Sequence, residues 1–452
     1  MNAPESYFIS YPAIKHPLVS ETLALKLKYI SLLEYYRTRI CPTSVQALSR
    51  LNRFKSDFLL GEDVVEQDVN LCIRDIMKTR FAPFHFFSYR YVFLFDCVYL
   101  LSIDGFDHIN QISELINTHS NKRYHKKLNF MIERMVANPS ELAEIQMITP
   151  EMIKSLEATR KFLATEEKTV AFTATMSAGK STLINALIGQ SVAQTKKAAC
   201  TAAIMEFCSC PVYHPKYNMF IGNEVKRDLM PTEVKEASEG GTKAMTVVGY
   251  FNSRVNSHKL RVIDTPGVDF SRNPIHKRIT ENELKQRNHD LLIYVISVVN
   301  YGNEDDFRHL QFIKSKAKYK KIIFAVNMMD TCDFEDDSVG EILTNIKGHL
   351  SQIGFPNPIV CPISAKAGFL FKRVLSKSQL SNRERDELDA YCAKYQDINY
   401  DMSPYYFVSG VDRLCDEGHL IKGLPYDHIY QLYLRTGLPQ FESIILKQIE
   451  EE

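Results

Sequence analysis

The sequence lacks an excess of charge of either sign. Its 55 lysine and arginine residues nearly cancel its 54 aspartate and glutamate residues. A protein that binds nucleic acid or an anionic surface through its overall charge is therefore not expected. Residues 122–127 form a local basic run, which we interpret as a solvated helix face. Nucleic acid is accordingly not predicted as a partner.

The sequence also lacks the marks of a secreted or membrane-spanning protein. Its ten cysteines show no paired spacing, which favours a reduced, cytosolic protein over a disulfide-linked one. No basic segment followed by an apolar one stands at the N-terminus, so no secretion signal is expected. The most apolar stretch, 91–103, is shorter than the roughly 20 residues that a membrane-spanning helix needs, and Asp96 interrupts it.

We interpret the stretch 91–103 as a buried helix of a helical domain. An aromatic run at 81–87 precedes it and gives this part of the chain an aromatic-rich face. The sequence therefore predicts a cytoplasmic protein. Peripheral docking of the aromatic-rich face on the inner surface of a membrane is the alternative.

The first 165 residues have a helical pattern. Apolar residues recur at three- and four-residue spacing, and glycine is scarce. The last helix is the clearest, because Thr149 is suited to cap its start and Pro150 suits its first turn. Residues 1–165 are therefore predicted to form an all-helical N-terminal region, which would serve as a stalk or neck, or as a module that binds a partner.

From residue 166 onward, short β-type runs alternate with helices. This alternation predicts an α/β domain over 166–452, with a mainly parallel sheet covered by helices on both faces. Residues 369–435 interrupt the alternation with a charged helix and an irregular segment, which we interpret as an insertion, and a helix at 436–450 follows. The predicted strands are 169–174, 203–207, 246–251, 260–263, 291–298 and 322–326.

The run that starts at Ala174 reads Ala-Thr-Met-Ser-Ala-Gly-Lys-Ser and lies between a predicted strand and a predicted helix. In this arrangement consecutive backbone N–H groups and the positive end of the helix dipole face an anion. Lys180 can reach the β- and γ-phosphates of a nucleotide, and Ser181 offers a hydroxyl to Mg²⁺. The predicted phosphate-binding residues are Ser177, Ala178, Gly179, Lys180, Ser181 and Thr182.

Two further segments suit the phosphates and a metal ion. Asp264, in the run Asp-Thr-Pro-Gly, directly follows the predicted strand 260–263, where its carboxylate can hold Mg²⁺ through a water. The N–H of Gly267 in the same run can bond the γ-phosphate and report its loss on hydrolysis. Thr201, in the run Cys-Thr-Ala-Ala-Ile, is the candidate switch threonine. The predicted Mg²⁺ ligands are Ser181, Thr201 and Asp264.

Recognition of a base is predicted from two later segments. The run Asn327-Met-Met-Asp330 directly follows an apolar strand, and the Asp330 carboxylate can accept the N1–H and N2–H of guanine, a donor pair that adenine lacks. Ser364-Ala365-Lys366 would present its backbone to guanine O6. Five motifs in one order, several of them at the carboxyl ends of strands, favour a site for GTP and GDP over an unrelated α/β protein with chance motifs.

These motifs together resemble the GTPase domain of the dynamin superfamily, and in particular bacterial dynamin-like proteins. They read TMSAGKSTLINALIG, CTAAI, DTPG, NMMD and SAK. Two features are similar to this family rather than to the Era or Ras-like branches. One is Ser177, two residues before the loop glycine, and the other is the strand followed by an acidic helix start at 294–306. The resemblance covers 166–368 and extends to 436–450, whereas 1–150 carry no matching motif.

The resemblance implies GTP hydrolysis by a self-associating enzyme. Val268 stands where Ras-like enzymes have a water-orienting glutamine, so water positioning would fall to Ser177 and the backbone around Thr201. In the family, two GTPase domains meet face to face across the nucleotide and complete the site, which implies low basal turnover that rises with self-association. The catalytic residues implied are Ser177, Lys180, Thr201 and Gly267.

The sequence departs from the family pattern at three points. Met176 occupies a position that is polar in several members, and it bears on catalysis assisted by a monovalent cation. Met328 replaces the lysine of Asn-Lys-x-Asp, which removes a polar contact to the ribose. The chain stops at Glu452, before the long helical stalk and lipid-binding tip of membrane-remodelling members. Residues 1–165 are therefore the expected stalk or lever.

Two functions of different classes follow from these features. The first is a GTP-hydrolysing dynamin-like mechanoenzyme or switch that forms a nucleotide-dependent homodimer, with a membrane as one place of action. The alternative is a catalytically weak, GTP-dependent interaction module that recruits a separate partner, such as a second dynamin-like chain, through residues 1–150. A GTPase that acts on the ribosome or on nucleic acid is disfavoured, because no RNA-binding module is recognisable.

Overall fold

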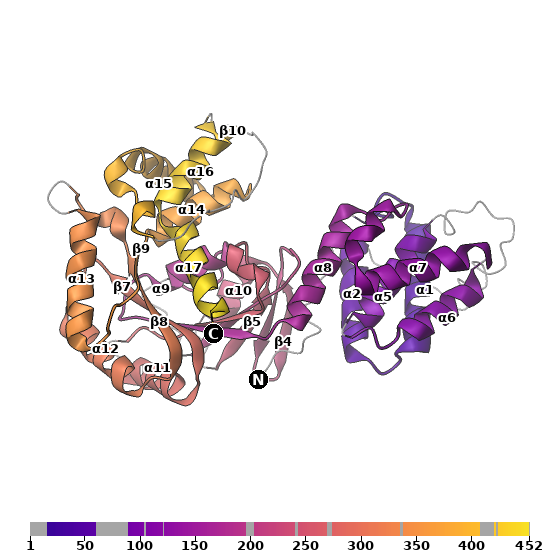
Figure 1. The fold of residues 1–452 in the computed structure, drawn as a ribbon, viewed down its shortest axis with the longest axis horizontal. Coiled ribbons are helices and arrows are strands. Elements are labelled where there is room, and N and C mark those ends of the chain that lie inside the picture. Colours follow the sequence, from indigo (N-terminus) through magenta and orange to yellow (C-terminus); the bar gives the residue numbers. More distant parts are fainter. Residues whose placement is uncertain are drawn as a thin grey trace. The chain divides into compact units, whose positions relative to one another are not determined.

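Contacts within the computed structural model divide the chain into two units (Figure 1). Unit 1 consists of Met1–Glu166 with Cys210–His214, and unit 2 consists of Glu167–Ser209 with Pro215–Glu452. Unit 1 is helical, and unit 2 combines a sheet with helices. The structure describes residues 16–59, 89–103, 105–120, 122–195, 203–239, 243–268, 274–334, 338–406, 420–421 and 424–451.

Unit 1 is built around helix α5 (Arg90–Ser102), which is buried from Tyr91 onward. This burial confirms the interpretation of the apolar stretch as a core helix. The carboxylate of Asp96 has partners inside the core, because the Tyr29 hydroxyl donates to its Oδ2 at 2.5 Å and His16 Nε2 lies 3.0 Å from the same oxygen. The other described helices of the unit are α1 (Leu23–Ile40), α2 (Val45–Phe58), α6 (Ile109–His119), α7 (Lys122–Ala137), the 3-10 helix η3 (Pro139–Glu144) and α8 (Pro150–Ala164).

Helix α8 begins as its sequence predicts. Thr149 Oγ1 accepts a hydrogen bond from the N–H of Met152 at 3.3 Å, and Pro150 occupies the first turn. Met152 and Leu156 are buried in the core of unit 1, where each contributes about 1.5–3 kcal/mol. Within the described ranges, no helix of either unit combines the length and the apolar composition that a membrane crossing requires.

Unit 2 contains a mainly parallel sheet in the order β4-β3-β5-β2-β6-β1-β7-β8-β9. One block of the sheet is parallel throughout and consists of β6, β1, β7, β8 and β9. Strand β2 is parallel to β5 but antiparallel to β6. Strand β3 is antiparallel to both of its neighbours, β4 and β5. The strands are β1 (Lys168–Thr173), β2 (Met205–Ser209), β3 (Tyr217–Ile221), β4 (Glu224–Leu229), β5 (Met245–Gly249), β6 (Leu260–Asp264), β7 (His289–Ser297), β8 (Tyr319–Asn327) and β9 (Val360–Pro362).

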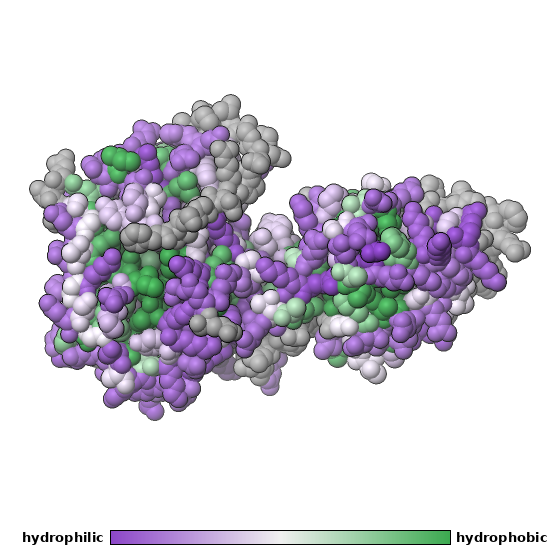
Figure 2. Space-filling model, in the orientation of Figure 1, coloured by the Kyte–Doolittle hydropathy of each residue, from purple (hydrophilic) through white to green (hydrophobic). Residues whose placement is uncertain are grey.

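Successive residues of the central strands face opposite sides of this sheet. Phe172 and Ile293 pack into one apolar core with α9, α14 and α17, and Ala171 and Leu292 pack into another with α11, α12 and α13. Helices therefore cover both faces, which confirms the predicted α/β fold. Hydrophilic residues prevail around the margin of the face in view, and hydrophobic residues show in its middle (Figure 2). The helices are α9 (Lys180–Ile188), α10 (Pro231–Ser238), α11 (Pro274–Gln286), α12 (Glu304–Lys316), α13 (Val339–Ile353), α14 (Ala365–Leu375), α15 (Asn382–Lys394), α16 (Tyr426–Arg435) and α17 (Leu438–Glu450).

The segment interpreted as an insertion, 369–435, begins and ends in the core of unit 2. Phe369 and Leu370 of α14 and Tyr433 of α16 are buried in that core. Helix α15, two 3-10 turns and the paired strands β10 (Leu420–Ile421) and β11 (Leu424–Pro425) lie between these two helices, and residues 407–419 and 422–423 lie outside the described ranges. Helix α15 is therefore the main described element that the alternating pattern of strands and helices does not account for.

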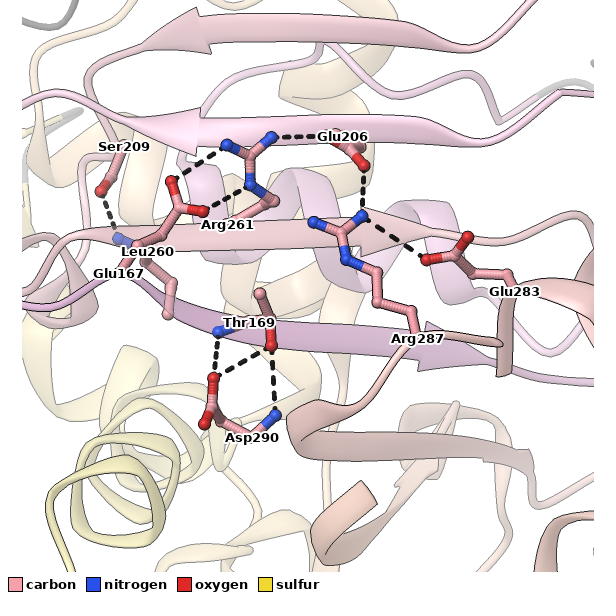
Figure 3. A network of polar contacts seen from close by, with 9 residues as sticks. All are labelled: Glu167, Thr169, Glu206, Ser209, Leu260, Arg261, Glu283, Arg287 and Asp290. Atoms are coloured by element: carbon pink, nitrogen blue, oxygen red, sulfur yellow. Dashed lines mark hydrogen bonds and ion pairs between the residues drawn. The ribbon is translucent and has the colours of Figure 1, made fainter. Parts of the chain in front are cut away.

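An ion-pair network at Arg261 links β6 to β2, to the residue before β1 and to the residue after α11 (Figure 3). Its side chain is 2% exposed, and it bonds Glu167 at 2.7 and 3.0 Å and Glu206 of β2 at 2.5 Å. Arg287, just after α11, bonds Glu206 at 2.6 Å. Burial raises the pKa of Glu206, but the two guanidinium groups outweigh this effect and hold the pKa below its usual value.

We expect Arg261→Ala to lower the free energy of unfolding by about 1.5–3 kcal/mol, because it removes the hydrogen bonds of the buried guanidinium group and leaves the half-buried Glu167 carboxylate without this cation. Urea unfolding followed by circular dichroism measures the loss. Arg308→Ala is the matched control, since this arginine pairs with Glu304 on an exposed helix surface, where a pair contributes about 0.3–0.5 kcal/mol. Equal losses in the two variants would contradict the importance of the network.

Candidate functional site

The loop between β1 and α9 contains two residues with positive φ angles and is hydrogen-bonded at one side to the segment after β6. Ser177 has a φ of 65° and Gly179 a φ of 79°, both in the left-handed region. The carbonyl of Ala174 accepts the N–H of Val268 at 3.0 Å, and the N–H of Met176 donates to the carbonyl of Val268 at 3.1 Å. The loop is thereby held against the segment that follows β6.

This loop lines a cavity of about 280 Å³ at the carboxyl ends of β1 and β6. The predicted Mg²⁺ ligand Thr201 lies outside the described residues. Three lining residues outside every predicted motif are Gln194, Thr195 and Met205, and Ala203 of the run Cys-Thr-Ala-Ala-Ile lines the cavity as well. The cavity brings together eight of the predicted residues, namely Ser177, Ala178, Gly179, Lys180, Ser181, Thr182, Asp264 and Gly267.

The electrostatics of the cavity suit a phosphate group. Lys180 is the first residue of α9, and its buried ammonium group forms an ion pair with Asp264. The Ser181 hydroxyl donates to the other carboxylate oxygen at 3.3 Å. The first N–H groups of a helix lack partners within the helix and carry its positive dipole end. The Ser181 hydroxyl beside the Asp264 carboxylate also fits Mg²⁺, which prefers oxygen ligands.

Asn327 ties the phosphate loop to the predicted base-recognition segments. Its Nδ2 donates to the carbonyl of Ala178 at 3.0 Å, and its Oδ1 accepts the N–H of Ala365 at 3.1 Å. It also lies so close to Gly179 that a Cβ there would come within 2.3 Å of Nδ2. Together with the positive φ, this close approach requires glycine at the position.

The Asp330 carboxylate is engaged by side chains from two other segments. Ser364 Oγ donates to its Oδ1, and the Tyr391 hydroxyl donates to its Oδ2 at 3.3 Å. Lys366 extends its ammonium group to Glu387 of α15, at 2.8 Å. The two base-recognition segments therefore contact each other. The residues that make these contacts do not line the cavity itself; they are Asp330, Ser364, Lys366, Tyr391 and Glu387.

Met176 and Met328, the two methionines that differ from the dynamin pattern, both line the cavity. Met176 lies against Gly267, where a Cβ would come within 3.3 Å of the Met176 Cγ. Met328 has a φ of 67°, and its sulfur accepts the Ser297 hydroxyl at 3.6 Å. Neither side chain carries an oxygen for a cation, so both contribute apolar surface at these positions.

Behind the loop lies a buried polar cluster that the motifs do not reveal. Thr175 of the loop donates to Asp306 Oδ1 at 2.9 Å, and the Tyr294 hydroxyl donates to the same oxygen at 2.8 Å. Burial raises the pKa of Asp306 above its usual value. Thr173 bonds His309 Nε2 at 2.8 Å, and burial lowers the pKa of His309 to about 3, so the ring is neutral at pH 7. The start of α12 is thereby fastened to the loop.

Residues 166–412, more than half of the chain, match the family model of the Elongation factor Tu GTP binding domain. The chain belongs to this family. It therefore contains a P-loop GTPase domain that binds a guanine nucleotide, and hydrolysis of GTP is the general activity of such domains.

Curated relatives share only part of their length with this GTPase. Subunit 1 of sulfate adenylyltransferase from Bacteroides fragilis is 26% identical over 158 residues, which cover 35% of this chain and 30% of the relative. Elongation factor 1-alpha 2 of Euplotes crassus is 30% identical over 131 residues, which cover 26% of this chain and 29% of the relative. The GTPase thus spans about 30% of the length of these relatives.

Among solved structures, one of an oligomerised bacterial dynamin pair is similar to this GTPase. The likeness covers 96% of this chain and 73% of the other, with 15% identity and a TM-score of 0.36. A likeness at this level assigns no branch among GTPases. The family match thus establishes the GTP-binding domain, and the narrower resemblance to dynamins is taken up as a proposal.

Proposed function

We propose that this GTPase is a dynamin-like mechanoenzyme or switch that hydrolyses GTP and self-associates according to its nucleotide state. The Lys180–Asp264 pair at the start of α9 carries the hydrolytic part of the proposal. The β- and γ-phosphates of GTP offer Lys180 an alternative partner, which frees Asp264 to hold Mg²⁺ with Ser181 and Thr201. Bound Mg²⁺ would supply charge neutralisation at the phosphates.

Completion of the site by a second copy is the next part of the proposal. Val268, which follows Gly267, is fully buried and offers no polar group to orient a water molecule. Gln194 lines the cavity, but its amide donates to Ser238 of α10 at 2.9 Å. Water positioning on this side would rest on Ser177 and the switch segment, which favours a site completed by a partner.

Two exposed apolar side chains mark a face for such a partner. Val299 is 63% exposed after the end of β7, and Phe307 is 47% exposed at the start of α12. Both lie near the carboxyl ends of the parallel strands β1 and β7. Phe307 directly follows Asp306, which bonds Thr175 of the phosphate loop. Exposed apolar side chains at the same end of the strands as the phosphate loop favour burial against a second copy.

We expect the rate of phosphate release per molecule to rise with protein concentration at saturating GTP. The double variant Val299→Ser/Phe307→Ser should abolish this rise while leaving GTP affinity unchanged, since neither side chain lines the cavity. Val225→Ser is the matched control, because this residue is 39% exposed on β4, at the far edge of the sheet. A rate per molecule that does not depend on concentration would contradict self-activation.

The second candidate is a catalytically weak module that binds GTP and recruits a partner, such as a second dynamin-like chain, through residues 1–150. The apolar side chains of Met176 and Met328 in the cavity favour it, because they stand where the dynamin pattern has polar residues. Tight GTP binding with undetectable phosphate release at every protein concentration would select this candidate over the enzyme.

A membrane surface is the proposed place of action. The aromatic run 81–87, expected to dock there, lies outside the described residues, so the solvated basic face of helix α7 is the surface proposed for it. Helix α7 of unit 1 exposes Lys122, Arg123, Lys126 and Lys127 together with Phe130. Cations beside an exposed aromatic ring suit anionic lipid headgroups. Co-sedimentation with liposomes of anionic lipid, with and without a non-hydrolysable GTP analogue, tests this part. Recovery of all protein in the supernatant in both states would remove the membrane from the proposal.

A further inference from the structure

Helix α15 has no part in the function proposed above, yet one of its faces contacts both base-recognition segments. Glu387, Tyr391 and Lys394 follow one another at spacings of four and three residues, which places them on one side of the helix. Glu387 pairs with Lys366, and the other two bond Asp330. A helix outside the nucleotide motifs therefore bears directly on the residues predicted to read the base.

The contacts at Asp330 hold both its carboxylate and its backbone. The Tyr391 hydroxyl donates to Oδ2 at 3.3 Å, Ser364 Oγ donates to Oδ1, and Lys394 Nζ donates to the backbone carbonyl at 2.8 Å. Each carboxylate oxygen has two lone-pair sites, so one hydroxyl on each oxygen leaves a site for a donor from the base. The carboxylate is therefore oriented before a base arrives.

Helix α15 is itself well anchored. The Ser381 hydroxyl accepts the N–H of Glu384, and the Glu384 carboxylate accepts the N–H of Ser381, so the two residues cap the helix reciprocally. Arg373 of α14 bonds the same carboxylate at 2.5 Å, and Leu388 is buried in the core of unit 2. A side chain on such a support can fix the position of a neighbouring group.

The Tyr391 phenol acts as a donor toward Asp330. Burial, and then the charge of the neighbouring carboxylate, raise the pKa of Tyr391 above its usual value. The phenol therefore keeps its proton throughout the neutral range. A hydroxyl donor to a charged oxygen makes one of the stronger hydrogen bonds in proteins.

We propose that Tyr391 and Lys394 are positioning residues for guanine recognition, through which α15 adjusts the affinity of this GTPase for guanine nucleotides. The inference rests on the proposed role of Asp330 as the acceptor for guanine N1–H and N2–H. A carboxylate that is already oriented loses little freedom on binding, so more of the bond energy is retained as affinity. The effect should fall on binding rather than on hydrolysis, because the base contacts are the same before and after phosphoryl transfer.

Tyr391→Phe in the full chain tests the proposal. We expect the dissociation constants of GTP and GDP to rise by the same factor, about 10-fold, with a matching rise in KM for GTP and an unchanged kcat. Tyr400→Phe is the matched control, because its hydroxyl donates to the carbonyl of Cys332 at 3.0 Å. Lys394→Met is an independent probe of the same helix face, with a change in the same direction.

A double-mutant cycle identifies the route of the effect. If Tyr391 acts through the Asp330 carboxylate, Tyr391→Phe should cause no further loss of GTP affinity when Asp330→Asn is already present. A further loss of the same size would overturn the proposal. So would wild-type affinity in both Tyr391→Phe and Lys394→Met, or an equal loss in Tyr400→Phe. A wild-type protein that binds no GTP would instead refute the proposed function, and this inference with it.

Discussion

Lys180→Ala is expected to lower the affinity for GTP by on the order of 10²–10⁴-fold while the secondary structure stays intact. The Lys180 ammonium group is buried at the start of α9, where it pairs with Asp264. Its hydrogen bonds to the β- and γ-phosphates would contribute about 1.5–3 kcal/mol each, and alanine offers no replacement. Isothermal titration calorimetry with GTP and GDP in the presence of Mg²⁺ measures the loss.

The two nucleotides and a distant lysine provide the controls for this variant. GTP should lose at least as much affinity as GDP, because Lys180 is expected to contact the γ-phosphate as well as the β-phosphate. Lys226→Ala should bind GTP as the wild type does, since Lys226 lies on the edge strand β4 and pairs loosely with Glu224 at 3.8 Å. Wild-type affinity in a folded Lys180→Ala protein would remove the phosphate loop from the nucleotide site.

The central strands of unit 2 are predictable from the sequence, and the strands at its edges are not. Central strands such as β7 are buried on both faces, so they read as apolar runs. No residue of β4 is buried, and its polar sequence gives no hydropathy signal. The available signal for β3 and β4 is the two-residue turn Gly222-Asn223, which joins Ile221 to its partner Glu224. Strand β9 has three residues, too few for a periodic pattern.

The candidate site divides in the same way between local and long-range features. The phosphate-binding residues are consecutive, so their spacing alone specifies the chemistry. The bond between Thr175 and Asp306 spans 131 positions, and the bond between Tyr391 and Asp330 spans 61. No local pattern relates such pairs, because only the packing of α12 and α15 brings them together.

The same distinction limits how finely the sequence identifies a branch of the family. The phosphate and base motifs are what a guanine-nucleotide site at the edge of such a sheet requires, and they agree with the family that residues 166–412 match. A branch is defined by residues that orient water or meet a partner, such as Ser177 and Val268. Their contribution depends on a second molecule, so concentration-dependent turnover is the measurement that tests the dynamin-like proposal.

Asp330→Asn is expected to weaken GTP binding by about 100-fold and to shift preference toward xanthosine triphosphate. Guanine presents two donors, N1–H and N2–H, and an asparagine side chain can accept only one of them with its single oxygen. Xanthine carries an oxygen in place of the amino group, and the asparagine amide can donate to that oxygen. Calorimetric titrations with GTP, GDP and xanthosine triphosphate measure the exchange of preference.

The pattern of losses distinguishes a reader of the base from a residue that merely supports the fold. GTP and GDP share the base, so Asp330→Asn should weaken both by the same factor, whereas Lys180→Ala should weaken GTP at least as much as GDP. Asp386→Asn is the matched control, because this carboxylate is exposed on α15. A gain for xanthosine triphosphate cannot arise from general destabilisation, which weakens every nucleotide. Weaker GTP binding without that gain would therefore show that Asp330 does not contact the base.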